Sequence, residues 1–303
     1  MARRTAQRSK AKLRLGISGP AGSGKSMSSL LMAYGITGDW SKISVIDTEN
    51  NSADLYADYS HNGIEIGVFN VCPISTPYTP EKYISAIKEC EDAGDAVIII
   101  DSLTHAWAGE GGLLDKKGQI EKAGKPGVNS WTAWRDITPM HNRLVESILT
   151  SKCHVVATLR AKMEHVQEKD PTTGRTVVRK IGMNPIQRDG MEYEFTVFID
   201  VDQDHNATSS KDRTSLVDGL VFRPGVDTGK NFLAWLETGA DKAPNDGPKI
   251  NWQAFWSEMA KFGITEEEVH KAAKVDSIKD WDKPSVDKLY LELKASKATQ
   301  PAQ

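Results

Sequence analysis

Apolar and polar positions in the first half of the chain alternate between two periods. Short β-branched or leucine-rich runs predict strands, and apolar residues three or four positions apart predict amphipathic helices. The expected strands are Leu13–Ser18, Lys42–Asp47, Ile64–Val71, Ala96–Ile100 and Cys153–Leu159, and the expected helices are Ser26–Ile36, Ala53–Tyr59, Thr79–Asp92 and Ser130–Thr150. Strands that alternate with helices predict an α/β fold with a mostly parallel central sheet covered on both sides.

After residue 160 the pattern becomes typical of antiparallel strands. The stretch before the turn sequence at 170–174 and residues 176–178 after it look like the two arms of a hairpin. Residues 193–201 alternate between apolar and polar, further short strands follow to about residue 222, and Thr228–Glu237 has the period of a helix. We therefore expect an antiparallel β extension of the sheet.

The last quarter of the chain reads as a separate small helical module. Residues 239–249 form a polar linker with two prolines and two glycines. Apolar spacing beyond the linker predicts three short helices, one of which begins with a capping box at Thr265 and Glu268. The expected helices are Asn251–Phe262, Thr265–Lys274 and Ser285–Lys294. The expected organisation is a basic N-terminal arm at 1–12, free of fixed structure, a core at 13–238, a linker at 239–249, a helical module at 250–297 and a tail at 298–303.

Composition places the chain among cytoplasmic globular proteins. Its 303 residues are 39% hydrophobic, which excludes whole-chain disorder, and no run approaches the roughly 20 apolar residues that span a bilayer. Three cysteines without a C-x-x-C pattern indicate neither a disulfide framework nor a zinc site. The net charge of −3 conceals two basic regions: six cations and no acid in residues 1–14, and eight cations against four acids in residues 151–190.

The segment after the first strand fits the phosphate-loop motif G-x-x-x-x-G-K-[ST], between a strand and a helix as the motif requires. Its glycines let backbone N–H groups turn toward phosphate oxygens at a helix N-terminus. Lys25 supplies charge to the β- and γ-phosphates, and Ser26 supplies a hydroxyl ligand to Mg²⁺. The residues expected to bind the nucleotide are Gly19, Pro20, Ala21, Gly22, Ser23, Gly24, Lys25, Ser26 and Met27. Because the chain has no N-K-x-D motif for guanine, ATP is favoured over GTP.

Acidic residues stand at the ends of two predicted strands. Asp101 follows the buried run Val97–Ile100, where it is expected to hold Mg²⁺ together with Ser26. Glu49 follows the second strand, at the same sheet edge as the phosphate loop, and is our candidate for the base that polarises the attacking water. Asp47 is the alternative base.

The phosphate loop, Glu49 and Asp101, in this order along the chain, resemble the motifs of the RecA-like recombinase ATPases. Ile46-Asp47-Thr48-Glu49 is similar to the family's I-D-x-E, in which the glutamate is the catalytic base. A closer likeness, to phage-encoded core-only RecA-like ATPases of the AAA type, is carried by Asp101–Trp107, Trp131–Asp136, Ile181–Phe195 and Ser210–Thr214. That group is associated with single-strand annealing and recombination. The resemblance implies a RecA-like P-loop NTPase core, ATP and Mg²⁺ as cofactors, and a host-cytoplasmic location.

The resemblance also implies roles for residues later in the chain. Thr158 stands where the family has a polar sensor, usually the glutamine of N-Q-x-R, and Arg160 is retained. Lys211 and Arg213 resemble paired cations that reach the γ-phosphate of a neighbouring subunit. A working site would then need a homo-oligomer, either a ring or a filament, and phage recombination or replication proteins are possible partners.

Two segments have the composition of a surface for single-stranded DNA. The stretch between Ser102 and Arg135 holds six glycines and four lysines and is flanked by three tryptophans, which predicts a flexible loop with stacking faces. For Trp131 and Trp134, packing in the core is the alternative. The second segment, Ala161–Gly190, is rich in cations and begins beside Thr158. The candidate DNA contacts are Trp107, Lys116, Lys117, Arg160, Lys162, Arg175, Arg179, Lys180 and Arg188.

The sequence as a whole predicts an ATP-binding, Mg²⁺-dependent ATPase that is stimulated by single-stranded DNA in phage-type recombination or annealing. Lys25, Glu49, Lys211 and Arg213 are the expected catalytic residues. Two alternatives remain open. One is a motor or loader ATPase that remodels a replication complex, and the other is a nucleotide switch that binds ATP without hydrolysing it.

Overall fold

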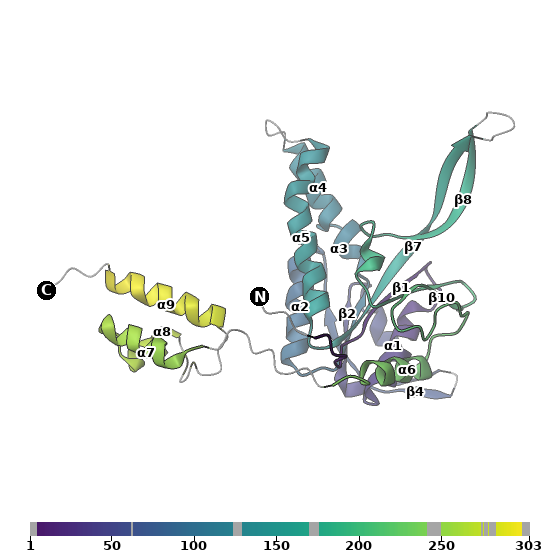
Figure 1. The fold of residues 1–303 in the computed structure, drawn as a ribbon. Helices are drawn as coiled ribbons and strands as arrows, with labels where there is room; N and C mark the ends of the chain where they lie inside the picture. The colour runs from purple at the N-terminus through teal and green to yellow at the C-terminus, as the bar shows by residue number, and fades with distance from the viewer. Residues whose placement is uncertain are drawn as a thin grey trace. The chain divides into compact units, whose positions relative to one another are not determined.

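A computed structural model describes residues 5–61, 63–123, 129–169, 176–240, 250–273, 275, 278 and 283–298. The chain divides into two compact units, residues 1–240 and 241–303. The first unit contains the sheet and the helices that cover it (Figure 1), and the second contains helices α7, α8 and α9.

The first unit is built on a sheet whose central strands run parallel. In spatial order its strands are β10 (Ala207–Asp212), β9 (Val197–Val201), β1 (Arg14–Gly19), β7 (His154–Lys169), β6 (Val97–Asp101), β2 (Ile43–Asp47) and β5 (Asn70–Pro73). Strand β10 pairs antiparallel with β9, and β8 (Thr176–Pro185) pairs antiparallel with β7. The remaining pairs of this sheet are parallel. The predicted fold class is confirmed: this is the architecture of a RecA-like P-loop NTPase core.

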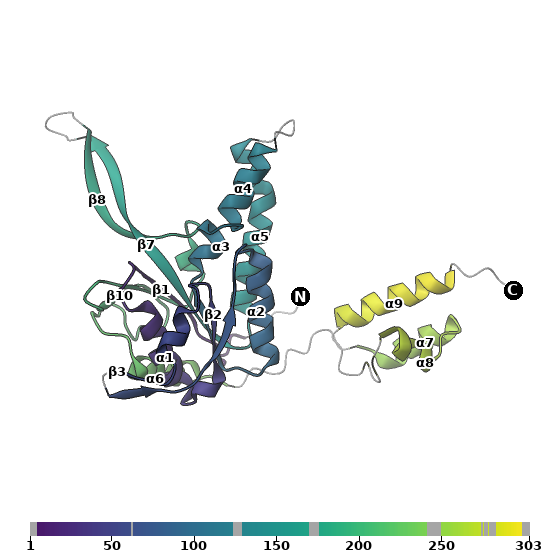
Figure 2. The ribbon, with the colours of Figure 1, turned by 180° about the vertical axis from the view of Figure 1, so that it is seen from behind.

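Helices cover both faces of this sheet. Helices α1 (Lys25–Thr37) and α6 (Val226–Leu236) pack together on one face, and α2 (Pro80–Asp92) and α5 (Ser130–Thr150) pack together on the other (Figures 1 and 2). Strand β6 contributes to both cores, because Ile99 joins the cluster of α1 and α6 while Ile98 and Ile100 join that of α2 and α5. This double burial explains why the run 97–100 has no polar position.

The segment between β6 and α5 corrects the expectation of a flexible loop. Helices α3 (Thr104–Ala108) and α4 (Leu113–Lys122) occupy it, and α4 packs against α5. The expectation was wrong because several of the glycines that suggested a loop bound or fit helices. Gly109 ends α3, Gly112 precedes α4, and Gly118 lies inside α4 with open space beside it.

Smaller differences follow from local contacts. The helix expected over 53–59 is the 3₁₀ turn η2 (Ser52–Tyr56), and the strand expected over 64–71 is split. Its first part is β4 (Ile64–Ile66), which pairs with β3 (Tyr59–His61), and its last part is β5 in the main sheet. Between them the chain passes close to Trp40, in the 3₁₀ turn η1 (Trp40–Lys42): a Cβ on Gly67 would lie 2.7 Å from the indole Cδ1.

The second half of the first unit is less antiparallel than expected. Strand β9 begins at Val197, after the 3₁₀ turn η3 (Met191–Tyr193), and pairs parallel with β1, on the side of β1 away from β7. Strand β7 continues past the sheet and forms a long hairpin with β8 that extends in the same direction as α4 and α5 (Figures 1 and 2). The turn expected at 170–174 lies outside the described residues.

The N-terminal arm is partly docked, which corrects the expectation of a free arm. Ser9 forms a β-bridge with Ala240, and the Lys10 backbone N–H donates to the Ala240 carbonyl at 2.9 Å. The Arg8 guanidinium lies 4.4 Å from the ring centroid of Trp235 and donates to its carbonyl. A cation over an indole face stabilises such a contact.

The second unit is a small bundle of α7 (Trp252–Lys261), α8 (Glu266–Ala273) and α9 (Lys283–Ala298). Its core is a separate cluster that includes Phe255, Met259 and Leu289. The capping box is confirmed, because the Glu268 N–H donates to Thr265 Oγ1 and the Thr265 N–H donates to Glu268 Oε2. Among the helices of the described residues, none has the length and apolar character that crossing a membrane requires.

Candidate nucleotide site

The phosphate loop joins the end of β1 to the start of α1. Gly22 and Gly24 adopt φ values of +81° and +84°, a left-handed backbone that favours glycine. Within the described residues, no side chain caps the first turn of α1, so its N–H groups are available for ligand oxygens. The Lys25 ammonium folds back over the loop and donates to the carbonyls of Gly19 at 2.9 Å and Pro20 at 2.7 Å. The loop therefore fits a phosphate chain.

Lys25 is partly withdrawn from water. Burial lowers the pKa of its ammonium, while the carboxylates of Asp101 and Glu49 oppose that shift. Its two loop carbonyl partners are neutral, so an anionic ligand would offer the ammonium stronger, charge-assisted bonds.

Asp101, one of the two predicted magnesium ligands, connects the other, Ser26, with the predicted sensor Thr158. Ser26 Oγ donates to Asp101 Oδ2 at 2.5 Å, and Thr158 Oγ1 donates to Asp101 Oδ1 at 2.6 Å. Burial raises the pKa of this carboxyl group, while the two hydroxyl donors oppose the shift. A carboxylate and a hydroxyl are hard oxygen donors of the kind Mg²⁺ takes, together with substrate phosphates. In the described part of the chain, no group of three or more His, Cys, Asp or Glu forms a metal cage by itself.

Glu49 is held by an arginine from another strand. Arg160 Nε donates to Glu49 Oε1 at 3.0 Å, and the Arg160 NH2 group donates to Oε2. Ser102 Oγ also donates to Oε1, at 3.1 Å. The Glu49 side chain retains 22% exposure, so it lies at the edge of the site but does not point freely into it.

Asp47, the alternative base, has a structural task instead. Its carboxylate accepts the N–H groups of Glu49 and Ala53 at 2.5 and 3.0 Å, and the residue is 2% exposed. These bonds fix the turn that starts η2. Glu49 is therefore the better placed of the two acids.

A polar network behind Glu49 was not found from the sequence. Thr48 Oγ1 accepts the Ser102 N–H at 2.9 Å and lies 2.8 Å from His105 Nδ1. His105 Nε2 lies 3.9 Å from Glu49 Oε1, and its ring stacks on Tyr78 with centroids 4.8 Å apart. Burial lowers the pKa of His105, and the Glu49 carboxylate opposes this shift. The signal was present in Asp101-Ser-Leu-Thr-His105, but no role followed from it.

The turn between β9 and β10 also reaches the phosphate loop. His205 Nδ1 lies 3.0 Å from the Ser23 carbonyl oxygen, and Gln203 Nε2 donates to the Ala21 carbonyl at 3.3 Å. A Cβ on Gly24 would lie 3.0 Å from His205 Nδ1. Each of these two contacts joins residues 182 positions apart in the chain, and no local sequence pattern predicts either.

Lys211 and Arg213 lie at the end of the β9–β10 strand pair that is far from the phosphate loop. Lys211 pairs with Phe198 at the amino end of β9, whereas the carboxyl end, at Val201, adjoins Gly19. The Arg213 N–H donates to the Thr196 carbonyl, which places it further still from the loop. At about 3.3 Å per residue, both lie about 10 to 16 Å along the strand from the phosphate loop. Within one chain they do not join the site.

Trp107 corrects the expectation of an exposed stacking face. The residue is 8% exposed, stacks on Trp134 with centroids 5.8 Å apart, and contacts the His141 ring edge-on. It is buried because α3 and α4 fold the predicted loop into a small core with Leu113 and Ile137. The exposed tryptophan of this region is Trp131, at 86%.

Three of the other candidate DNA contacts are paired with acids within the chain. Lys116 donates to Glu81 at 3.1 Å, Lys117 pairs with Glu121, and Arg160 pairs with Glu49. Lys162 is exposed at the base of the hairpin. Arg175 lies outside the described residues, and only the backbone is described for Arg179 and Lys180. Arg188 lies beside Trp134.

The fold and the loop define the class of protein. A glycine-rich loop joins β1 to α1, and the buried Asp101 at the end of β6 lies beside Ser26. This is the arrangement of a P-loop ATPase. A family model described as an AAA domain matches residues 11–237, three quarters of the chain, so the chain belongs to this family of ATP-binding P-loop ATPases. A comparison with curated proteins finds no match.

Proposed function

We propose that the protein is a Mg²⁺-dependent ATPase stimulated by single-stranded DNA, acting in recombination or strand annealing of the phage type. The observation that carries the proposal is the ion pair between Glu49 and Arg160. Arg160 lies on β7, the strand that continues as the cationic hairpin with β8. The candidate base and the candidate DNA segment therefore meet in one contact.

The residues divide the chemistry between them. Lys25 and the loop N–H groups would hold the phosphates, and Ser26 with Asp101 would hold Mg²⁺, which neutralises phosphate charge when bound. Thr158 keeps the Asp101 carboxylate in place through its hydroxyl. Glu49 would accept a proton from the attacking water. In a homo-oligomer, Lys211 and Arg213 would reach a neighbouring subunit's nucleotide.

The ion pair supports low turnover without DNA. Both Glu49 oxygens accept from Arg160, and Ser102 donates to one of them as well. A carboxylate whose two oxygens are already held by other donors has fewer lone pairs left to accept a hydrogen bond from an attacking water. A DNA phosphate competes for the same guanidinium, because arginine binds phosphate and carboxylate through the same bidentate geometry. Strand binding would then release Glu49.

The test is phosphate release with and without a single-stranded oligonucleotide, across a salt series. We expect stimulation in the wild type and a steep loss of DNA binding with salt, since phosphate contacts release counterions. Arg160→Gln should raise the DNA-free rate and remove the stimulation. Glu49→Gln should abolish turnover but keep ATP binding. Lys88→Gln, which changes an exposed lysine on α2, is the matched control.

Three outcomes would contradict the proposal. The absence of both stimulation and salt-sensitive DNA binding excludes the DNA role. Equal turnover in the wild type and Glu49→Gln, with tight ATP binding, indicates the nucleotide switch. Steady translocation along a strand indicates the motor or loader.

A further inference from the structure

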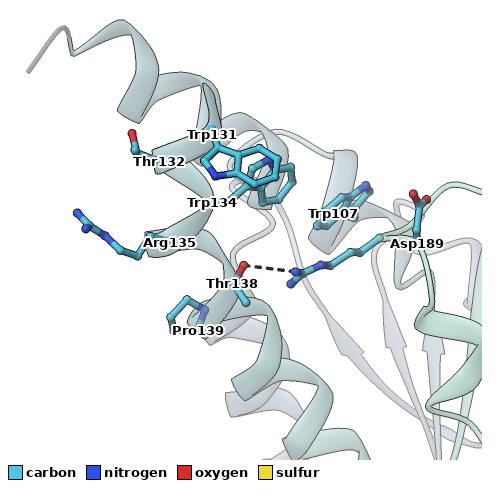
Figure 3. A pocket seen from close by; sticks show the side chains of 9 residues that line it. Trp107, Trp131, Thr132, Trp134, Arg135, Thr138, Pro139 and Asp189 are labelled. Atoms are coloured by element: carbon cyan, nitrogen blue, oxygen red, sulfur yellow. Dashed lines mark hydrogen bonds between the residues drawn. The ribbon is translucent and has the colours of Figure 1, made fainter. Parts of the chain in front are cut away.

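A large pocket separate from the phosphate loop lies between α5 and the segment that follows β8 (Figure 3). Its volume is about 860 Å³, within the range of ligand sites. Tryptophans at 107, 131 and 134 line it together with Arg188. The nucleotide site uses none of these side chains.

Several of the side chains that line the pocket are flat. The indoles of Trp107 and Trp134 lie within 17° of parallel, and the Arg188 guanidinium carbon is 5.9 Å from the Trp134 centroid. Arg188 is steadied by a long hydrogen bond of 3.4 Å to Thr138 Oγ1, the dashed line in Figure 3. Flat lining groups suit a planar ring, because nucleic acid bases stack on aromatic side chains and also on arginine guanidinium planes.

Trp131 presents its indole to solvent at the mouth of this pocket (Figure 3). It stands in the first turn of α5, where Asn129 Oδ1 accepts the N–H groups of Trp131 and Thr132, both at 2.9 Å. The cap fixes the backbone that carries the indole. An indole face left in water beside this pocket is available for stacking, and a fixed backbone lowers the entropic cost of binding.

The charge of the pocket favours an anion. Arg135 and Arg188 line it against the single carboxylate of Asp189. Neither arginine forms an ion pair among the described residues, unlike Arg160 or Lys116. A nucleic acid strand combines flat rings with negative charge. Its base faces are free only when the strand is single, because a duplex keeps them stacked inside.

We propose that this pocket receives unstacked bases of single-stranded DNA, with Trp131 as the stacking platform and Arg188 as the contact to a neighbouring phosphate. The assignment rests on the proposed function, since it names the part of the molecule that distinguishes a single strand from any other polyanion. It places base stacking on α5 and one phosphate contact on Arg188, after β8, while the hairpin would meet other phosphates of the strand.

The test compares two oligonucleotides of equal length, oligo(dT) and an abasic deoxyribose-phosphate strand, by fluorescence anisotropy. The wild type should bind oligo(dT) more tightly by about tenfold, because stacking on one indole is worth roughly that factor. Trp131→Ala should remove this preference and leave affinity for the abasic strand unchanged, and Trp131→Phe should keep most of it. Tyr59→Ala, which removes another exposed aromatic ring, should change neither affinity.

The outcomes separate this proposal from the one on which it rests. If Trp131→Ala keeps the preference for oligo(dT), the pocket is not a base site. The same holds if the variant lowers the affinity for both strands equally. In either case the proposal of DNA binding stands. If the wild type binds neither strand, both proposals are overturned. Equal wild-type affinity for both strands, with steep salt dependence, contradicts the pocket alone.

Discussion

The phosphate-loop region and the tryptophan-lined pocket are organised in opposite ways. At the phosphate loop the ligand-binding groups are already engaged: Lys25 with carbonyls, Ser26 with Asp101, and Glu49 with Arg160. At the pocket, Trp131 and Arg135 are exposed and Arg188 is half-buried, and neither arginine forms an ion pair among the described residues. Ligand binding must therefore rearrange bonds at the first region, whereas the second is preformed. The first can be regulated by whatever competes for its internal partners.

The largest effect should separate the two regions by function. Lys25→Ala removes the ammonium that would meet the phosphates, and we expect turnover to fall by at least about 10²-fold, the scale for losing one electrostatic group aimed at a transition state. Binding of oligo(dT) in the absence of nucleotide should stay within about twofold, because the pocket lies on other elements. Phosphate release and anisotropy measure the two.

Mixing variants checks the subunit contacts in the same experiment. If Arg213 acts on a neighbouring site, an Arg213→Ala protein mixed with Lys25→Ala should regain part of the turnover that each lacks. No recovery in a confirmed mixed oligomer would remove Arg213 from the trans role.

The second prediction concerns packing. On the phosphate-loop side, α1 and α6 approach so closely that a Cβ on Gly229 would lie 2.1 Å from the Met32 carbonyl oxygen. Gly229→Ala must push the two backbones apart, and we expect a loss of about 2 to 3 kcal/mol in unfolding free energy. Urea denaturation measures it.

Gly118→Ala is the matched control on the pocket side. Gly118 lies within α4 and has no neighbour within 4 Å of an added Cβ. The alanine should stabilise the helix by up to about 1 kcal/mol. Equal losses in the two variants would contradict the distinction between a closely packed and an open region.

The separation along the chain between contacting residues explains which contacts could be predicted from the sequence. The phosphate loop is a contiguous motif, and Asp101 and Glu49 end strands whose apolar runs are local, so their positions followed from periodicity alone. The Glu49–Arg160 pair spans 111 residues and the His205 contact spans 182, and no local pattern encodes either. The glycine content around Trp107 indicates a loop, but Trp107 packs with Leu113 and Ile137 in a small core, and no local period along the chain pairs these three residues.

The smallest prediction uses pH to probe the core beneath the phosphate-loop side. His154 is 5% exposed, and its Nδ1 accepts the Leu13 N–H at 3.1 Å. Burial, with help from Lys12 and Arg14, lowers the pKa of His154 to about 3. An unfolded histidine titrates near 6.5, so only the unfolded chain gains this proton as pH falls below that value. Stability is therefore fully present above about pH 6.5 and declines below it.

Between about pH 7 and pH 5 this single group should cost about 2 kcal/mol of unfolding free energy, at up to about 1.4 kcal/mol per pH unit. His154→Asn offers a neutral acceptor for the Leu13 N–H and should remove that part of the pH dependence in urea titrations. His141, under the pocket, also has its pKa lowered by burial and by Arg188, but less strongly. His141→Asn should therefore flatten the profile less. The reverse order would mean that the more tightly closed core lies under the pocket.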